Sequence, residues 1–286
     1  MRLSAFIKVR ASSAFSMMKG LDMCMVVENV MIASNMYKMA FLSKDIALKA
    51  NPGQFVHIKV PGDNSLLLRR PISIHDVHPQ DGMVEIVYQV VGKGTRILSG
   101  INSGQIIDVL GPLGNGFEIP RGIKNAFMVG GGCGIAPLKF LIRRLKEMGV
   151  VVTALLGFRN QETVYGLNEF EMLSDQLLVT TDDGSLGRKG LVTQVLEEKL
   201  LQQLPDIMFA CGPVPMLKAV QRIAREYNVP CQISLEERMG CGIGGCLVCS
   251  CAVRTPNGDF EYRRVCKDGP IFWSEEVILD EATVER

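Results

Sequence analysis

Five of the nine cysteines lie near the C-terminal end of this 286-residue chain, and the spacing of four of them restricts the fold more than any other feature. Three share one short segment, with four and then two residues between them, and the fourth follows after sixteen more: Cys241, Cys246, Cys249 and Cys266. The intervening Gly242, Gly244 and Gly245 allow the positive φ values and close approach that a loop around a metal centre needs. The odd cysteine count and this clustering favour a metal centre in a reducing cytosol over a secreted disulfide framework.

The spacing indicates a [2Fe-2S] cluster held by these four cysteines. A C-x4-C-x2-C segment with a distant fourth cysteine is the arrangement that plant-type ferredoxins use. Zinc is the main alternative, because four thiolates also make a closed tetrahedral site, but structural zinc sites usually pair two short C-x2-C knuckles. Cys251 falls outside the pattern, and we expect it not to be a ligand.

Charge and hydropathy exclude other broad classes of protein. The formal net charge of +1 gives no extended basic field, so nothing supports nucleic-acid binding. Lys19, Asp22 and Glu28 interrupt the most apolar stretch, which leaves no run of the roughly 18 residues that a membrane span needs. We therefore predict a cytoplasmic protein that binds neither nucleic acid nor membrane.

Residues 1–24 stand apart from the rest of the chain. They contain basic residues and serines, with Asp22 as the one acidic residue, and so resemble a transit peptide superficially. The first strand-like run begins near Met25. We therefore predict that residues 1–24 are an extension, either disordered or the product of a mis-assigned start.

Short runs of β-branched and apolar residues fill the segment 25–120. Examples are Met25–Val30, Phe55–Val60 and Val84–Val91, and turn-forming residues such as Asn51-Pro52-Gly53 separate them. Closely spaced strands with such turns are typical of a small antiparallel β-barrel.

In the segment 121–236 the sequence pattern changes to one of alternating strands and helices. Pro137 opens an amphipathic helix directly after the apolar run Ala126–Val129 and a glycine cluster. Further strand and helix patterns follow, which predicts a parallel sheet covered on both faces. The expected fold is thus a β-barrel domain, an α/β parallel-sheet domain and a small C-terminal [2Fe-2S] domain in residues 237–286.

Two weaker signals point to nucleotide cofactors. Arg70 to Ser73 lie on a predicted barrel strand, and Gly94-Thr95 follows another strand. The glycine-rich turn at residues 130–134 lies directly between a strand and a helix, where a dinucleotide can approach the backbone and the helix N-terminus favours its phosphates. This turn is not a GxGxxG fingerprint.

Together these stretches resemble the ferredoxin–NADP reductase superfamily. In that superfamily an Arg-x-x-Ser stretch holds FAD, with the arginine on the diphosphate and the serine near the isoalloxazine ring, and a glycine–threonine turn closes over the flavin. The resemblance implies that a glycine-rich turn and a Cys-Gly-Pro stretch border the NAD site, although Cys133 and Cys211 could equally be packing residues. The implied cofactor-binding residues are Arg70, Pro71, Ile72, Ser73, Val87, Tyr88, Gln89, Gly94, Thr95, Gly131, Gly132, Gly134, Cys211, Gly212 and Pro213.

From Met25 to the C-terminus, the domain order and the stretch from Leu235 to Cys241 are similar to the electron-transfer subunits of class 1B dihydroorotate dehydrogenases. Related subunits of sulfhydrogenases and NADH-dependent ferredoxin–NADP oxidoreductases commonly carry aspartate where this chain has Cys241. The resemblance implies an oxidoreductase subunit of pyrimidine (UMP) biosynthesis, in a heterotetramer with two FMN-containing catalytic subunits. Electrons would pass from FMN through the [2Fe-2S] cluster and FAD to NAD⁺, and no catalytic acid or base is expected here.

Two alternatives stay open: a diaphorase subunit of one of those related complexes, and a non-catalytic iron–sulfur redox sensor or zinc-bound interaction module. Asp182 and Asp183 follow a predicted strand, where a carboxylate could bind a ribose and repel a 2′-phosphate, so NAD is favoured over NADP. A solvated turn is the competing interpretation. Glu236 and Glu237 are expected to be exposed, and the three histidines to be structural or exposed: His57, His75 and His78.

Overall fold

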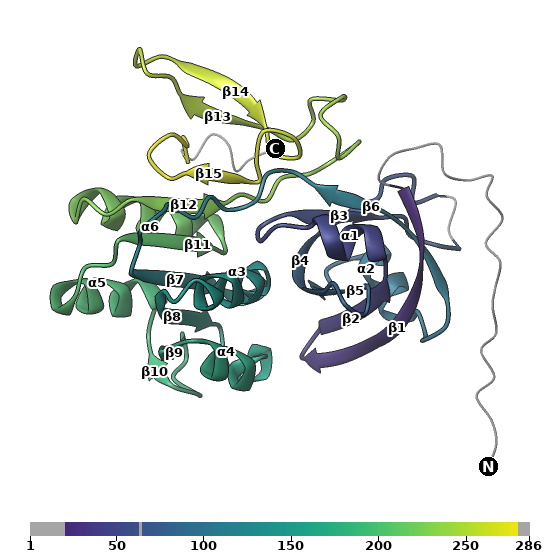
Figure 1. The fold of residues 1–286 in the computed structure, drawn as a ribbon, viewed down its shortest axis with the longest axis horizontal. Helices are drawn as coiled ribbons and strands as arrows, with labels where there is room; N and C mark the ends of the chain where they lie inside the picture. The colour runs from purple at the N-terminus through teal and green to yellow at the C-terminus, as the bar shows by residue number, and fades with distance from the viewer. Residues whose placement is uncertain (1–20, 63–64, 280–286) are drawn as a thin grey trace.

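The computed structural model describes residues 21–62 and 65–279 and has three parts (Figure 1). Most of the predicted extension, residues 1–20, lies outside the described residues. Strand β1 (Leu21–Ala33) begins earlier than expected, so residues 21–24 belong to the first domain and not to an extension. The reason is that Cys24 is fully buried and pairs with Ile107 of β6, a distant partner that the local sequence does not reveal.

The first part is a closed antiparallel barrel with the strand order β1-β2-β5-β4-β3-β6. Pairing of β6 with β1 closes it, so that no strand edge stays open. Alternate side chains such as Phe41, Ile74 and Ile86 fill the interior. The remaining elements are β2 (Met36–Leu42), α1 (Lys44–Lys49), β3 (Phe55–Ile58), β4 (Arg70–His78), β5 (Met83–Gln89), α2 (Lys93–Ser99) and β6 (Ile106–Leu113).

The second part is a seven-stranded sheet with the order β10-β9-β8-β7-β11-β12-β15. Its first six strands in this order run parallel, as expected from the strand–helix alternation. The C-terminal region adds the antiparallel edge strand β15, which was not predicted. The strands are β7 (Asn125–Gly131), β8 (Val151–Phe158), β9 (Gln176–Thr181), β10 (Arg188–Lys189), β11 (Ile207–Cys211), β12 (Cys231–Ser234) and β15 (Ile271–Trp273).

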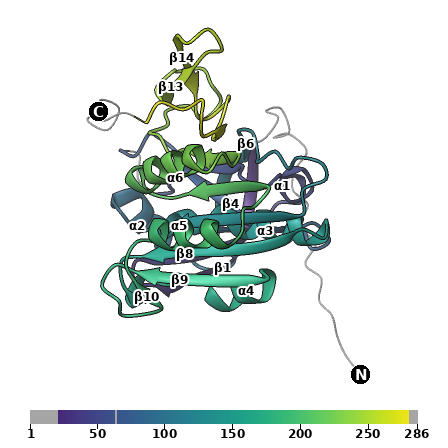
Figure 2. The same ribbon diagram turned by 90° about the vertical axis from the view of Figure 1, so that its left-hand side faces the viewer.

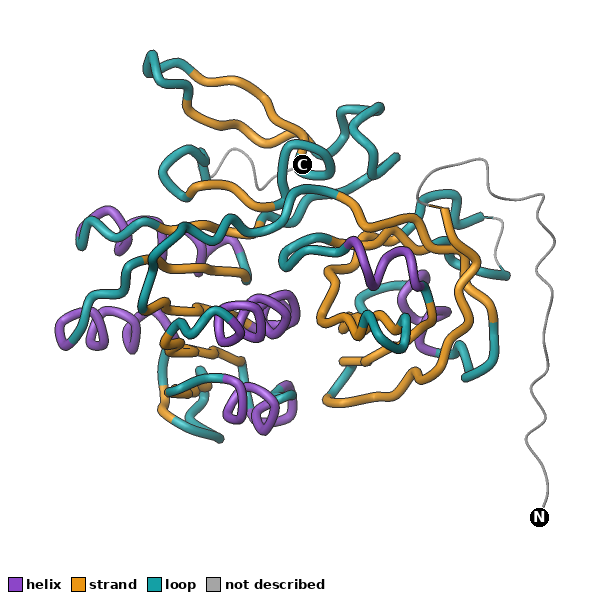
Figure 3. The backbone as a smooth tube through the Cα atoms, viewed as in Figure 1, coloured by secondary structure: helices purple, strands orange, loops and turns teal. Residues whose placement is uncertain are grey.

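Helices cover both faces of this sheet (Figure 1, Figure 3). Helices α3 (Ala136–Glu147) and α4 (Leu167–Leu173) lie on the side that faces the barrel, and α5 (Val192–Gln202) and α6 (Val214–Glu226) lie on the other. Short 3-10 turns, Gly132–Ile135 and Gln161–Thr163, precede α3 and α4. The predicted fold class is confirmed.

The third part is a small unit that sits above both other parts (Figure 1, Figure 2). A long loop after β12 leads to the hairpin of β13 (Ser250–Arg254) and β14 (Phe260–Arg264), and the chain then returns to the sheet as β15. Val253 and Val265 share a hydrophobic core with α5 and α6. The exact domain boundaries stay a prediction. Within the described part of the chain, no helix is long and apolar enough to cross a membrane.

Candidate functional site

Residues 240–249, here called the cluster loop, bring three of the predicted ligands, Cys241, Cys246 and Cys249, close to the fourth, Cys266. Backbone N–H groups donate to their sulfurs: Gly245 N–H to Cys241 Sγ at 3.2 Å and Gly244 N–H to Cys266 Sγ at 3.2 Å. The N–H of Cys241 donates to Cys246 Sγ, and that of Cys266 to Cys249 Sγ, both at 3.4 Å. Four neighbouring sulfurs that already accept backbone N–H bonds, three from the cluster loop and one from Cys266, form a donor set that fits an iron–sulfur cluster.

The backbone conformation explains why glycine is needed in the cluster loop. Gly242 has φ +74° and Gly244 has φ +84°, values that side chains other than glycine rarely adopt. Burial opposes ionisation of Cys241, but N–H groups of Ile243, Cys246 and Gly245 outweigh it and lower the pKa of its thiol to about 6. The loop therefore favours a thiolate at Cys241, the position where related oxidoreductase subunits commonly carry aspartate.

The cluster loop has a buried side and an exposed side. Cys249 and Cys266 are buried, whereas Cys246 is exposed. Cys251, on β13, belongs to the same hydrophobic core as Cys249 and Cys266, but it takes part in none of the N–H to sulfur bonds named above. Burial and the nearby Glu237 carboxylate raise the pKa of its thiol to about 12. This geometry agrees with a set of four cysteines that leaves Cys251 out.

The predicted flavin residues meet at one end of the barrel. Arg70 is the first residue of β4, and a Cβ added to Gly94 of α2 would lie only 2.5 Å from its Nε. The absence of a side chain at Gly94 thus leaves room for the guanidinium. Thr95 accepts hydrogen bonds from the N–H groups of Val91 and Gly92 through Oγ1, at 3.0 and 3.2 Å, which fixes the first turn of α2.

The other predicted flavin residues lie on the same two strands. Pro71 and Ser73 have solvent access on β4, with buried Ile72 between them. On β5, Val87 and Tyr88 are buried, whereas Gln89 is exposed. The Tyr88 hydroxyl donates to Asn29 Oδ1 at 2.9 Å, and burial raises the pKa of this phenol. Pro71, Ser73 and Gln89 are therefore the accessible members of the set.

The two predicted nicotinamide stretches pack against each other at the carboxyl ends of neighbouring parallel strands. Gly130 on β7 is in register with Cys211 on β11. A Cβ on Gly134 would lie 2.6 Å from the carbonyl oxygen of Cys211, and one on Gly131 would lie 3.0 Å from Pro213 Cδ. Gly132 has φ +54° and lies at the surface end of this turn. Ligands of open α/β sheets bind at this edge.

A cysteine pair and a carboxylate lie beside this turn. Burial and the charge of Glu236 raise the pKa of Cys133 to about 12 and also raise that of Cys211. The Tyr165 hydroxyl donates to the Cys133 carbonyl oxygen at 3.2 Å. Glu236 keeps solvent access, as expected, but enough protein surrounds it to raise its pKa through desolvation. Its charge acts on Cys133, Tyr165 and Cys211, which lie in or beside the glycine-rich turn.

Asp182 and Asp183 follow β9 in an exposed turn. The Asp182 N–H donates to the Phe158 carbonyl oxygen at 3.0 Å, which ties the turn to β8. Asp183 Oδ1 accepts from the N–H and hydroxyl of Ser185 at 2.9 and 2.6 Å, and these bonds lower its pKa. Both residues directly follow the carboxyl end of β9, the edge at which open α/β sheets bind ligands.

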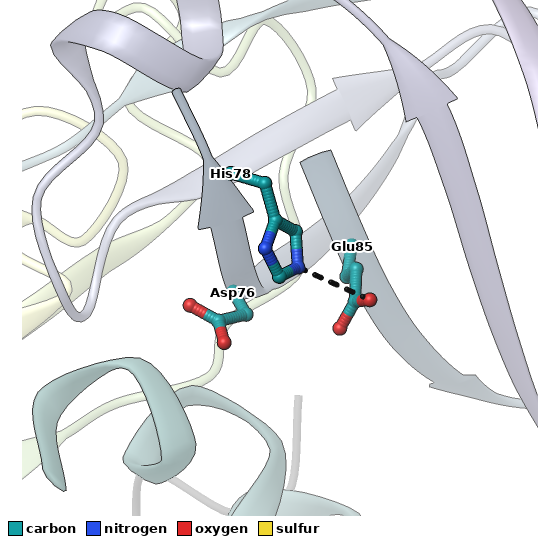
Figure 4. Close-up of side chains that lie close together, drawn as sticks. All are labelled: Asp76, His78 and Glu85. Atoms are coloured by element: carbon teal, nitrogen blue, oxygen red, sulfur yellow. Dashed lines mark ion pairs between the residues drawn. The ribbon is translucent and has the colours of Figure 1, made fainter. Parts of the chain in front are cut away.

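The histidines are placed differently from one another. His57 and His75 are buried, and His78 is half-buried. His78 lies with Asp76 and Glu85 in a group whose ligand atoms are within 4.8 Å of one another (Figure 4). Sequence reasoning missed this group, because its members are spread over two barrel strands without a metal-ligand spacing.

Family models match all three parts of the chain. An oxidoreductase FAD-binding domain matches residues 23–117, an oxidoreductase NAD-binding domain matches residues 128–222, and the iron–sulfur cluster binding domain of dihydroorotate dehydrogenase B matches residues 236–278. These ranges agree with the barrel, the parallel sheet and the unit that holds the cluster loop.

Curated relatives and solved structures agree with these matches. The dihydroorotate dehydrogenase B (NAD(+)) electron transfer subunit of Caldanaerobacter subterraneus subsp. tengcongensis is 47% identical over 89% of this chain and 97% of its own length. The same subunit of Bacillus velezensis is 45% identical over 89% and 97%. A chain of the NADH-dependent reduced ferredoxin–NADP oxidoreductase structure has a TM-score of 0.82 and 39% identity, and the match covers 93% of this chain and 94% of that one. This chain therefore belongs to the family of dihydroorotate dehydrogenase B electron transfer subunits.

Proposed function

We propose that this chain is the electron transfer subunit of an NAD-dependent dihydroorotate dehydrogenase B in pyrimidine biosynthesis. It takes electrons from the FMN of a separate catalytic subunit and delivers them to NAD⁺ by way of a [2Fe-2S] cluster and FAD. The observation that carries the proposal is that Cys241 completes a set of four thiols in a cluster loop that packs against the barrel. Family membership supports the same assignment.

Each cofactor has a distinct set of residues on this chain. Cys241, Cys246, Cys249 and Cys266 would hold the cluster. Arg70 and Gly94 would hold the FAD diphosphate, with the other predicted residues of β4 and β5 along the flavin. A bound flavin exchanges electrons singly or as a hydride pair, and the cluster exchanges them one at a time. In this proposal the chain itself places the cofactors, and the chemistry on dihydroorotate takes place in the catalytic subunit.

The nicotinamide would lie at the edge formed by Gly131, Gly132 and Gly134 with Cys211, Gly212 and Pro213. The two stretches are packed closely, and glycine keeps the backbone approachable there. The carboxylates of Asp182 and Asp183 support NAD over NADP, because they would repel a 2′-phosphate.

The catalytic partner would dock over the exposed side of the cluster loop. Ile243, Leu247 and Val248 are 60%, 64% and 58% exposed there, which makes an apolar patch beside the cysteines. A heterotetramer with two subunits of each kind is the proposed assembly. The nine free cysteines support a reducing cytosol as its location.

Cofactor analysis of the purified chain tests this proposal. We expect flavin, iron and acid-labile sulfide, together with NADH-dependent reduction of an artificial dye. Stoichiometric zinc without flavin would instead support an interaction module and overturn the assignment.

A second candidate is the corresponding subunit of an NADH-dependent ferredoxin–NADP oxidoreductase, because the similarity to that structure extends over nearly the whole chain. Cys241 argues against it, since aspartate is common there in those subunits. Co-purification with a partner that uses NADPH and ferredoxin, in place of dihydroorotate, would favour this candidate.

A further inference from the structure

Four charged residues join the barrel to helix α3, and we call them the interdomain charge cluster: Asp76, Glu85, Lys139 and Arg143. Asp76 on β4 and Glu85 on β5 are buried, with only 2% and 8% of their surface exposed. Arg143 donates to Asp76 Oδ1 from Nε at 3.0 Å and from Nη2 at 2.7 Å. Lys139 Nζ lies 3.3 Å from Glu85 Oε2 and 3.7 Å from Asp76 Oδ2. The barrel thus supplies both anions, and the nucleotide domain supplies both cations.

The carboxylates of this cluster are not a metal site, although His78 lies beside them (Figure 4). The ammonium of Lys139 already lies within ion-pair distance of both, and it also pairs with Glu169 on α4. A divalent cation would have to displace this ammonium against its charge. The cations of α3 therefore neutralise the buried anions.

Helix α3 packs on both domains at once. Leu138 and Leu141 belong to the hydrophobic core of the sheet, whereas Phe140 belongs to that of the barrel. At the start of the helix, His75 Nδ1 lies 2.7 Å from the Ala136 carbonyl oxygen. Because a carbonyl oxygen can only accept, this nitrogen donates the hydrogen bond. The barrel is thus bonded to α3 at its first residue and again two turns later.

The position of α3 determines the position of the nicotinamide turn. The helix begins directly after the 3-10 turn Gly132–Ile135, so any slide of α3 on the barrel moves that turn relative to Arg70 and Ser73 on β4. A buried ion pair adds little net stability, but the loss of one partner leaves an uncompensated buried charge. Such a cluster therefore tolerates only one relative placement of the two domains.

We propose that the interdomain charge cluster is a positioning device that sets the nicotinamide turn against the flavin strand. Lys139 and Arg143 are its positioning residues, and neither belongs to the predicted cofactor-binding set. The proposal rests on the proposed function, because it concerns the step in which NADH gives two electrons and one proton together, as hydride, to bound FAD and leaves as NAD⁺. The one-electron exit through the cluster loop does not depend on α3.

The Lys139→Met variant tests this proposal, because it keeps the length of the side chain and removes its charge. We expect the rate of flavin bleaching by NADH in anaerobic stopped flow to fall by about ten- to a hundredfold, the loss that a small misplacement of reacting groups causes. Hydrogen exchange of the segment 131–136 should become faster. Oxidation of the dithionite-reduced protein by a one-electron acceptor should be unchanged.

Arg144→Met is the matched control, since Arg144 lies on the same helix, is 54% exposed on its side chain and pairs with Glu147 in solvent. It should match the wild type in all three measurements. If Lys139→Met fails to fold, Arg143→Lys provides a milder test, because it keeps the charge but loses the paired contact on Asp76; we expect a smaller fall in the same step.

Two results would overturn the proposal: NADH bleaching at the wild-type rate in both variants, or an equal loss of bleaching and of one-electron oxidation. Failure of the proposed function would look different. In that case the wild-type protein would bind no flavin, or NADH would not bleach it.

Discussion

A Cβ atom added to Gly242 of the cluster loop would lie 3.1 Å from Cε1 of His57 and closer still to its Nδ1. His57 lies on barrel strand β3 and is completely buried. Burial, together with the charge of Arg69, lowers the pKa of its imidazole to about 4, so the ring is neutral at pH 7. The cluster loop is thus seated directly on the barrel through a contact between a glycine and a neutral histidine.

The Gly242→Ala substitution should therefore reduce cluster incorporation. The new methyl group would collide with His57, and the φ of +74° at this position is strained for alanine. We expect a clear loss of bound iron and sulfide per chain, measured by chemical analysis, with flavin content retained.

Gly104→Ala is the matched control for this substitution. Gly104 has φ +85°, but nothing lies within 4 Å of an added Cβ. It should keep the full iron content, with a stability cost of about 1 kcal/mol from backbone strain alone. Full iron loading in Gly242→Ala would show that the contact between Gly242 and His57 is not needed for cluster incorporation.

The two neighbouring buried cysteines Cys249 and Cys251 should respond differently to serine. Cys249→Ser should lose the cluster absorbance, because a predicted ligand is replaced in a loop that has no spare thiol. Cys251→Ser should keep it and lose only packing, since Cys249 Sγ accepts an N–H bond from the predicted ligand Cys266 and Cys251 falls outside the ligand spacing. Visible absorbance and electron paramagnetic resonance of the reduced proteins are the measurements. Equal loss in both would mean that the ligand set is wrong.

Asp182→Asn should reduce the ratio of the KM for NADPH to the KM for NADH. Removal of one carboxylate at the ribose edge removes repulsion of a 2′-phosphate, and we expect about a tenfold lower KM for NADPH, in the range of a like-charge interaction near a protein surface. Dye reduction with each nucleotide measures this change. An unaltered ratio of the two KM values would assign Asp182 to a solvated turn.

Acid stability should depend on Glu169. The imidazole of His75, whose Nε2 lies 3.9 Å from Glu169 Oε2, and then the ammonium of Lys139 lower the pKa of Glu169 from 4.5 to about 2 against the opposing effect of burial. Because the pKa of Glu169 is lower in the folded than in the unfolded chain, its ionised carboxylate stabilises the fold above pH 4.5, and this contribution is lost as the pH falls toward 2.

Urea unfolding of the wild type and of Glu169→Gln measures this effect. The difference in their free energies of unfolding should be constant above pH 4.5 and should shrink at lower pH. A difference that does not change with pH would assign the effect of the substitution to packing.

The three-part fold could be predicted from the chain because each part has its own local pattern. Spaced strands indicated the barrel, strand–helix alternation indicated the parallel sheet, and four cysteines marked the third unit. The return of β15 to the sheet could not be predicted, since Ile271–Trp273 is a short apolar segment whose partner lies far away in sequence. The extra barrel residues Leu21–Cys24 were missed for a related reason, because their strand is defined by pairing with β6.

The charged contacts between the barrel and helix α3 could not be predicted from the sequence either. Lys139 and Arg143 have the spacing of a solvent-exposed helix face, and that face lies against another domain. Asp76 and Glu85 are buried polar residues within the barrel strands β4 and β5. These four residues come together only in the folded chain, because β4 and α3 lie far apart in sequence and nothing in the local pattern of either element indicates that they are in contact.

The central claim is that this chain links dihydroorotate oxidation to NAD⁺, and reconstitution with an FMN-containing dihydroorotate dehydrogenase subunit tests it most directly. The measurement is dihydroorotate-dependent formation of NADH by the complex, by each subunit alone, and by a complex that carries Cys249→Ser. We expect NADH formation only in the wild-type complex. Formation of NADH by this chain alone, or undiminished formation with Cys249→Ser, would contradict it.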